Sequence, residues 1–74
     1  MTKAEKIKLV KYERNRYQLS EFYKGILDKY PDDEHAKTLY RMYTSEWSGL
    51  FSACLLLMGE SGYAETLAEL EVTA

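Results

Sequence analysis

The chain has 74 residues and contains one cysteine, one histidine and one proline. With Cys54 alone, a disulfide within the chain is excluded. A structural zinc site, which takes four ligands, is not expected either. A chain this short buries only about 60% of the surface that its unfolded form exposes, so its stability margin is thin. The remaining routes to a stable fold are very regular helix packing and self-association.

The sequence also lacks long apolar runs and a strong charge of one sign. Its longest apolar stretch, residues 50–58, is far shorter than the roughly 20 residues that span a membrane. The first apolar residues alternate with lysines, so they form no secretory signal. The net charge of −2 gives no general attraction to nucleic acid. We therefore expect a cytoplasmic protein with no membrane association, in which Cys54 is a small reduced core residue.

Two stretches of the chain carry mostly apolar side chains at alternating steps of three and four residues. This spacing keeps side chains on one face of a helix, and a sustained seven-residue repeat is typical of a coiled-coil seam. The first stretch consists of Leu9, Tyr12, Arg16, Leu19, Tyr23, Ile26 and Tyr30, and the second of Ala36, Tyr40, Tyr43, Trp47, Leu50, Cys54 and Leu57. The pattern predicts two long helices on either side of the single proline.

Local signals set the ends of these helices. Residues 2–5, Thr-Lys-Ala-Glu, have the form of a capping box, and residues before Pro31 avoid the α conformation. Asp32 or Asp33 can cap the second helix, and Gly59 is suited to end it. Residues 59–62 read as a loop by composition. The predicted helices are about 3–30, 33–58 and 63–72, within one helical domain of residues 1–74.

A short loop between the first two helices requires them to run antiparallel. Around residues 50–58 the second helix is apolar on all sides, which predicts burial on all sides. One neighbouring helix does not cover such a segment, so we expect the short third helix and a second copy of the chain to do so. The predicted fold is all-α: a long antiparallel helical hairpin with a short third C-terminal helix, dimerising into a four-helix-bundle-like assembly.

The inventory of reactive groups argues against an enzyme. There is no glycine-rich phosphate loop, and residues 59–62 do not form a G-x-S-x-G nucleophile elbow. His35 follows three acidic residues at the start of the second helix, and we interpret this group as a solvated helix cap. We expect no catalytic residues, no metal site and no cofactor.

A second apolar stripe lies beside each seam, and the hairpin itself needs one seam only. Helical surfaces of this kind bind protein partners in grooves or on other helices. We therefore predict a non-enzymatic protein–protein interaction module, an adaptor or inhibitor, of the small accessory type. The candidate face for a partner or for self-association consists of Ile7, Val10, Tyr17, Leu39, Met42 and Leu56. Whether it serves a second copy or a foreign protein stays open.

The alternative function is a small dimeric regulator that binds nucleic acid through the basic N-terminal half of the first helix. Basic and aromatic side chains interleave there, which suits contact with a phosphate backbone and stacking on bases. The candidate residues are Lys6, Lys8, Lys11, Arg14 and Arg16. The acidic balance of the whole chain disfavours this alternative. Salt dependence discriminates between the two, because phosphate contacts weaken steeply as salt rises.

Overall fold

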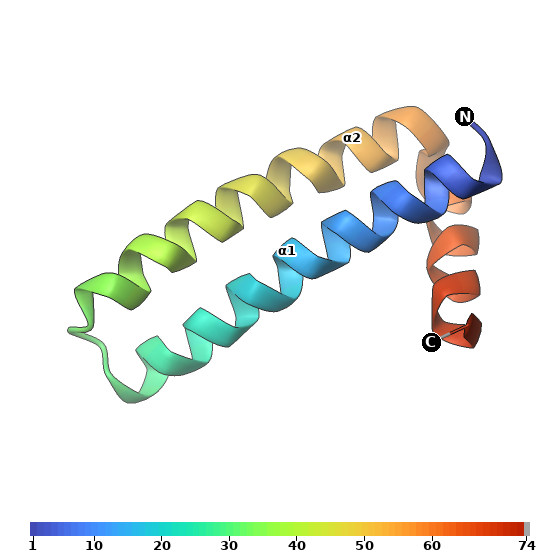
Figure 1. The fold of residues 1–74 in the computed structure, drawn as a ribbon. Coiled ribbons are helices and arrows are strands. Elements are labelled where there is room, and N and C mark those ends of the chain that lie inside the picture. The colour runs from blue at the N-terminus through green and yellow to red at the C-terminus, as the bar shows by residue number, and fades with distance from the viewer. Residues whose placement is uncertain (74) are drawn as a thin grey trace.

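The computed structural model describes residues 1–73 and consists of two long helices side by side (Figure 1). Helix α1 spans Lys3–Lys29 and helix α2 spans Glu34–Thr73. The two run antiparallel in an elongated molecule of 43 × 23 × 16 Å. The predicted all-α hairpin is therefore confirmed. Over the described residues, neither helix has a stretch long and apolar enough to cross a membrane.

Both ends of α1 follow from local chemistry. The Thr2 hydroxyl accepts a hydrogen bond from the Glu5 backbone N–H at 3.1 Å, and the Glu5 carboxylate accepts one from the Thr2 N–H at 2.9 Å. This is the predicted capping box, which satisfies two backbone donors that the first helical turn leaves free. At the other end Tyr30 donates its N–H to Ile26 at 2.8 Å, and Pro31 prevents continuation of the helix.

Asp33 caps the start of α2. Its Oδ1 accepts a hydrogen bond from the Ala36 N–H at 3.1 Å. The sequence left Asp32 and Asp33 as alternatives, and this bond selects Asp33. Its negative charge also lies where the dipole of α2 favours an anion.

Helix α2 bends sharply at Gly59, which has φ 73° and ψ 170°. This backbone conformation is open essentially to glycine alone, because a Cβ atom clashes there. The residues that follow, 60–73, are named here the C-terminal segment, and they cross beside the first turns of α1 (Figure 1). The sequence predicted a helix end at Gly59, a loop over 59–62 and a third helix. Gly59 does interrupt the helical backbone, but residues 60–62 are helical and no loop separates the C-terminal segment from the rest of α2, so a separate third helix is not shown.

Side chains from the two helices meet in antiparallel register. The hydroxyls of Ser20 and Thr44 lie 2.9 Å apart, and the rings of Tyr23 and Tyr43 stack with centroids 5.8 Å apart. The core is small. In the part of the chain that the structure describes, the buried apolar side chains are Val10, Ala36 and Cys54. The expected burial of Cys54 is confirmed.

The seam of α2 departs from the predicted seven-residue repeat toward its end. Leu57 was expected in the seam, yet 59% of it is exposed, whereas Met58 is half-buried. The rest of the predicted seam faces inward: Ala36 and Cys54 are buried, and Tyr40, Tyr43, Trp47 and Leu50 are half-buried. The departure from the seven-residue repeat is therefore confined to the last turn before Gly59.

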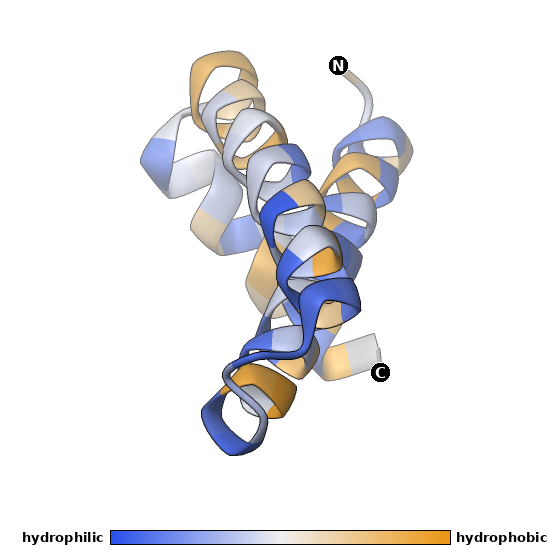
Figure 2. Ribbon diagram, turned by 90° about the vertical axis from the view of Figure 1, so that its left-hand side faces the viewer, coloured by the Kyte–Doolittle hydropathy of each residue, from blue (hydrophilic) through white to orange (hydrophobic). Residues whose placement is uncertain are grey.

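The most hydrophobic part of α2 precedes its bend (Figure 2). The sequence predicted burial on all sides there, but Leu56 is 86% exposed in the single chain. Leu56 lies two residues beyond the buried Cys54, about 200° around the helix axis. It therefore points away from α1, and the C-terminal segment leaves it uncovered. The prediction of all-round burial is wrong for one copy of the chain.

Candidate functional site

The carboxylate of Glu13 is fully buried where α1, α2 and the C-terminal segment meet. Trp47 of α2 donates its Nε1–H to Oε2 at 2.6 Å, and Tyr63 of the C-terminal segment donates its hydroxyl to Oε1 at 2.7 Å. Arg14 donates from Nε to both oxygens, at 3.0 and 3.1 Å. Glu13 thus joins three stretches of helix through one side chain.

These contacts keep Glu13 ionised. Burial raises the pKa of Glu13, but the hydrogen bonds from Arg14, Tyr63 and Trp47 together outweigh it, so the pKa lies below its ordinary value. The pKa of Tyr63 is raised, first by burial and then by its bond to the Glu13 carboxylate. A carboxylate anion beside a neutral phenol is therefore the stable pairing across the neutral pH range.

The arrangement around Glu13 does not resemble a reactive site. A carboxylate accepts about four hydrogen bonds, and the donors of Arg14, Trp47 and Tyr63 occupy both oxygens of Glu13. With no exposed surface, this group is closed to a substrate. Its role in the single chain is to position helices.

Aromatic rings surround this buried carboxylate on the side of the C-terminal segment. The rings of Tyr17, Trp47, Phe51 and Tyr63 follow one another with centroids 5.4, 5.4 and 5.5 Å apart. Spacings of this size are favourable for aromatic pairs. Cys54 is also fully buried, and burial raises the pKa of its thiol. Since the thiolate is the reactive form, Cys54 is an inert packing residue here.

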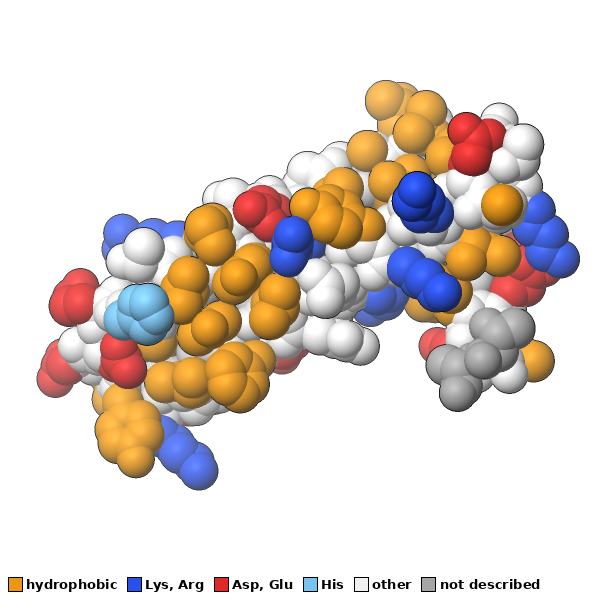
Figure 3. Space-filling model, in the orientation of Figure 1, with side chains coloured by type: hydrophobic (Ala, Val, Ile, Leu, Met, Phe, Trp, Pro, Cys, Tyr) orange, Lys and Arg blue, Asp and Glu red, His pale blue; other side chains and the backbone are white. Residues whose placement is uncertain are grey.

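The opposite broad side of the hairpin carries uncovered apolar side chains, which Figure 3 shows over both helices toward the loop end. On α1, Phe22 is 60% exposed and its ring meets that of Tyr23 edge to face at 5.1 Å. On α2, Met42 is 42% exposed and neighbours Tyr43, which stacks on Tyr23. We name this surface the aromatic face and define it by Tyr12, Phe22, Tyr23, Met42 and Tyr43.

A cation crosses the middle of the aromatic face. The guanidinium of Arg16 lies 4.6 Å from the ring centre of Tyr12 and 5.6 Å from that of Tyr43. Its Nε also approaches a carboxylate oxygen of Glu46 at 2.9 Å. The face is therefore apolar at its loop half and carries an internally paired charge further along.

The structure disperses the candidate partner residues instead of gathering them on one surface. Val10 is fully buried, and Tyr17 packs against Trp47 on the side of the C-terminal segment. Ile7 and Leu39 are half-buried. Met42 belongs to the aromatic face, whereas Leu56 points away from α1. Of the predicted set, Met42 and Leu56 are the residues with large exposed surfaces.

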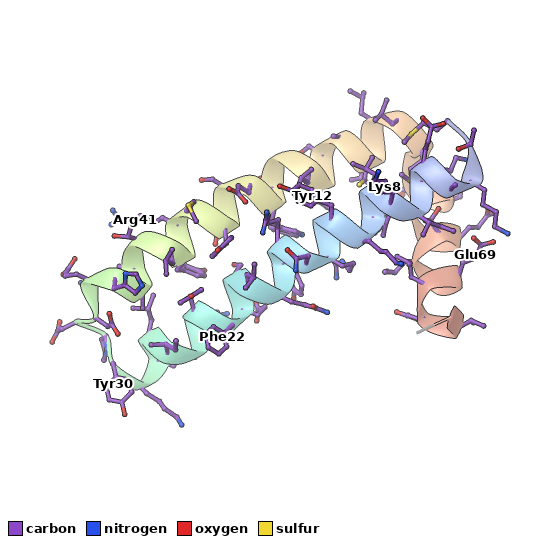
Figure 4. All side chains as sticks on the ribbon, in the orientation of Figure 1. Lys8, Tyr12, Phe22, Tyr30, Arg41 and Glu69 are labelled. Carbon is purple, nitrogen blue, oxygen red and sulfur yellow. The ribbon has the colours of Figure 1, made fainter. Side chains whose placement is uncertain are left out.

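The candidate nucleic-acid residues have different environments as well. Lys8 and Lys11 are exposed, and Lys6 is half-buried. Arg14 is held by Glu13, and Arg16 by Glu46 and Tyr12. Lys3, at the start of the same helix, pairs with Glu69 of the C-terminal segment at 3.0 Å (Figure 4). The basic helix is thus partly neutralised by acidic groups of this chain.

Two functional features were missed at the sequence level. Glu13 was not among the candidate residues, although Val10, Glu13, Tyr17 and Ser20 have helical spacing that could have revealed a shared buried side. Phe22 was assigned to no face. An aromatic residue outside both seams was a signal of an extra apolar surface.

Acidic residues and His35 at the start of α2 are exposed to solvent. Within residues 1–73, no three His, Cys, Asp or Glu side chains lie together in a way that could hold a metal ion.

Comparison with protein-family models, with curated proteins and with solved structures finds no match for this chain. The functional argument therefore rests on the surface and the charges of the chain itself.

Proposed function

We propose that this chain is a non-enzymatic protein-interaction module and that the aromatic face is its contact surface. The observation that carries the proposal is the exposure of Phe22 and Met42 beside the stacked Tyr23 and Tyr43. Aromatic residues and methionine are enriched where proteins bind one another. Contiguous apolar patches on soluble chains commonly mark interaction sites. Pairing of two copies into a four-helix-bundle-like assembly is part of the proposal.

Nucleic-acid binding through the start of α1 is the second candidate, supported by the exposure of Lys8 and Lys11. Arg14 and Arg16 are engaged with carboxylates, which weakens their attraction for phosphates. Two free lysines release few counterions, so the expected affinity and its salt dependence are both small. This balance favours the protein-interaction proposal.

A pull-down from lysate of the source cells, with and without nuclease, tests the proposal. The wild type is compared with the double variant Phe22→Glu/Met42→Glu and with Lys8→Glu/Lys11→Glu. We expect retained protein that survives nuclease and is lost in the Phe22→Glu/Met42→Glu variant. Nucleic acid retained by the wild type, with the protein lost on nuclease treatment, would transfer the function to nucleic acid.

A further inference from the structure

The hairpin is one layer of helices thick over most of its length. Its smallest dimension is 16 Å, and α1 and α2 lie side by side in the view of Figure 1. The C-terminal segment covers part of one broad side, where Tyr63 contacts Phe51 and Glu13. In Figure 3 no other part of residues 1–73 lies over the aromatic face. Since a domain buries its core between two layers, the second layer is missing on this side.

The exposed area indicates how much surface a second layer would cover. The chain exposes 5279 Å², whereas a compact protein of 8.6 kDa exposes about 4700 Å². The excess of about 600 Å² is of the same order as the roughly 800 Å² per partner that a stable interface buries. A broad side of 43 × 23 Å has room for a contact of this size.

The two ends of this side complement each other in shape and charge. At the end of the hairpin opposite the loop, a shallow hollow lies against the first three turns of α1. Its lining is Met1, Glu5, Lys8, Leu9, Lys11 and Tyr12. At the loop end Tyr30 projects with 65% of its surface exposed, next to the exposed Asp32. Figure 4 shows Lys8 and Tyr30 at these opposite ends. The hollow carries Lys8 and Lys11 against Glu5, whereas the loop end carries Asp28, Asp32 and Asp33 against Lys29, so an excess of positive charge faces an excess of negative charge.

We propose that the aromatic face pairs with the aromatic face of a second copy of this chain, antiparallel about a two-fold axis near Leu19. This inference rests on the proposed function, because it names the occupant of the same surface. Leu19 is equally far, about 16 Å along α1, from Lys8 and from Tyr30. The two-fold axis therefore brings Tyr30 and Asp32 of each copy to the hollow of the other. The aromatic faces of both copies are then covered, and the result is an antiparallel four-helix bundle.

The first test is the mass in solution by sedimentation equilibrium. The wild type is expected at twice 8.6 kDa at micromolar concentration, and Phe22→Glu/Met42→Glu at 8.6 kDa with unchanged helix content. Both replaced side chains are exposed, so the hairpin itself is preserved. Val72→Glu is the matched control, because Val72 is 86% exposed in the C-terminal segment, on the opposite broad side, and this variant is expected to remain paired. A monomeric wild type at 100 µM, a Phe22→Glu/Met42→Glu variant that stays paired, or dissociation by Val72→Glu overturns the proposal.

The second test addresses the antiparallel orientation through charge reversal. Lys8→Glu is expected to raise the dissociation constant about fivefold or more, and adding Asp32→Lys to the same chain is expected to restore it. Within one copy, Asp32 lies in the loop that follows α1, and its distance from Lys8 along the axis of that helix is more than 30 Å. The rescue therefore operates only between copies. Asp33 is left intact because it caps α2. Failure of Asp32→Lys to rescue rejects the antiparallel arrangement.

These tests separate failure of the pairing from failure of the proposed function. If the wild type is monomeric but Phe22→Glu/Met42→Glu loses a captured protein in the pull-down, the pairing is overturned and the interaction face stands. If Phe22→Glu/Met42→Glu changes neither the mass in solution nor the captured protein, the pairing and the interaction face are both overturned.

Discussion

Glu13 receives hydrogen bonds from Arg14 of its own helix, from Trp47 of α2 and from Tyr63 beyond the bend. Each donor stabilises the carboxylate, and together they offset the cost of removing it from water. A domain of this size has a free energy of unfolding of only about 5 kcal/mol. Losing one of these contacts, which would leave a buried charge or donor without its partner, therefore costs a large fraction of the stability of the fold.

Replacing Glu13 by Gln tests this role. The amide removes the charge that Arg14 pairs with, and one of its polar atoms is a donor facing other donors. We expect the free energy of unfolding to fall by about 2 kcal/mol and the melting temperature by roughly 10 °C. Thermal melts followed by circular dichroism measure both. The exposed Glu21→Gln is the matched control, and an equal loss in the two variants would contradict a special role for Glu13.

The same cluster predicts how stability depends on pH. The pKa of Glu13 is lowered in the fold, so its contribution is present above the unfolded pKa of about 4.3 and is lost as the pH falls below it. The pKa of Tyr63 is raised, so its contribution is present below about pH 10 and is lost above it. We expect a plateau between these limits in wild-type melts. Glu13→Gln should flatten the acid side, and an unchanged acid profile would reject this assignment.

Burial of Glu13 was not predictable from its residue type. Glutamate is almost never fully buried unless it is paired, and its partners Trp47 and Tyr63 are 34 and 50 residues away in the sequence. The seam pattern identified Trp47 correctly as facing α1. It did not indicate that the indole N–H needs an acceptor on that helix.

Gly59 determines the course of the chain at the scale of a helix. Its positive φ turns the C-terminal segment toward α1, where Tyr63 reaches Glu13 and Lys3 reaches Glu69. Beyond the bend, the Thr66 hydroxyl donates to the Gly62 carbonyl at 2.8 Å within the helix. Gly59 is the residue with non-helical φ and ψ inside α2, so the bend is a single residue wide.

Substitution of glycines by alanine separates the bend from the straight helices. Gly59→Ala forces a side chain into a conformation that costs about 1–3 kcal/mol, so we expect a lower melting temperature. Gly25 and Gly49 are helical, and a Cβ atom at either position meets nothing within 4 Å. Gly25→Ala and Gly49→Ala should each raise stability by about 0.5–1 kcal/mol. The same sign of change at all three positions, measured by thermal melting, would contradict the bend at Gly59.

The sequence was sufficient for helix positions because their signals are local. The Thr2–Glu5 capping box, Pro31 and the cap at Asp33 act within a few residues of one another. Composition alone suggested a loop over residues 59–62. In the structure the helical backbone is interrupted at Gly59, and residues 60–62 are helical.

The whole molecule combines a small buried core with a large apolar surface. Among the described residues, three apolar side chains are buried, whereas Phe22, Met42 and Leu57 are each more than 40% exposed. The spare apolar surface was predictable from the sequence because the chain has more apolar stripes than a hairpin uses. Its location was not, since Val10 is fully buried and Tyr17 packs against Trp47. A fold with this balance gains stability when its apolar face is covered.

The most direct test of pairing through the aromatic face is the melting temperature of the wild type as a function of its own concentration. If two copies fold and pair together, mass action stabilises the folded state, and the melting temperature rises by several degrees between about 1 and 100 µM. The Phe22→Glu/Met42→Glu variant should then melt at one temperature across the same range. A wild-type melting temperature independent of concentration would contradict the account.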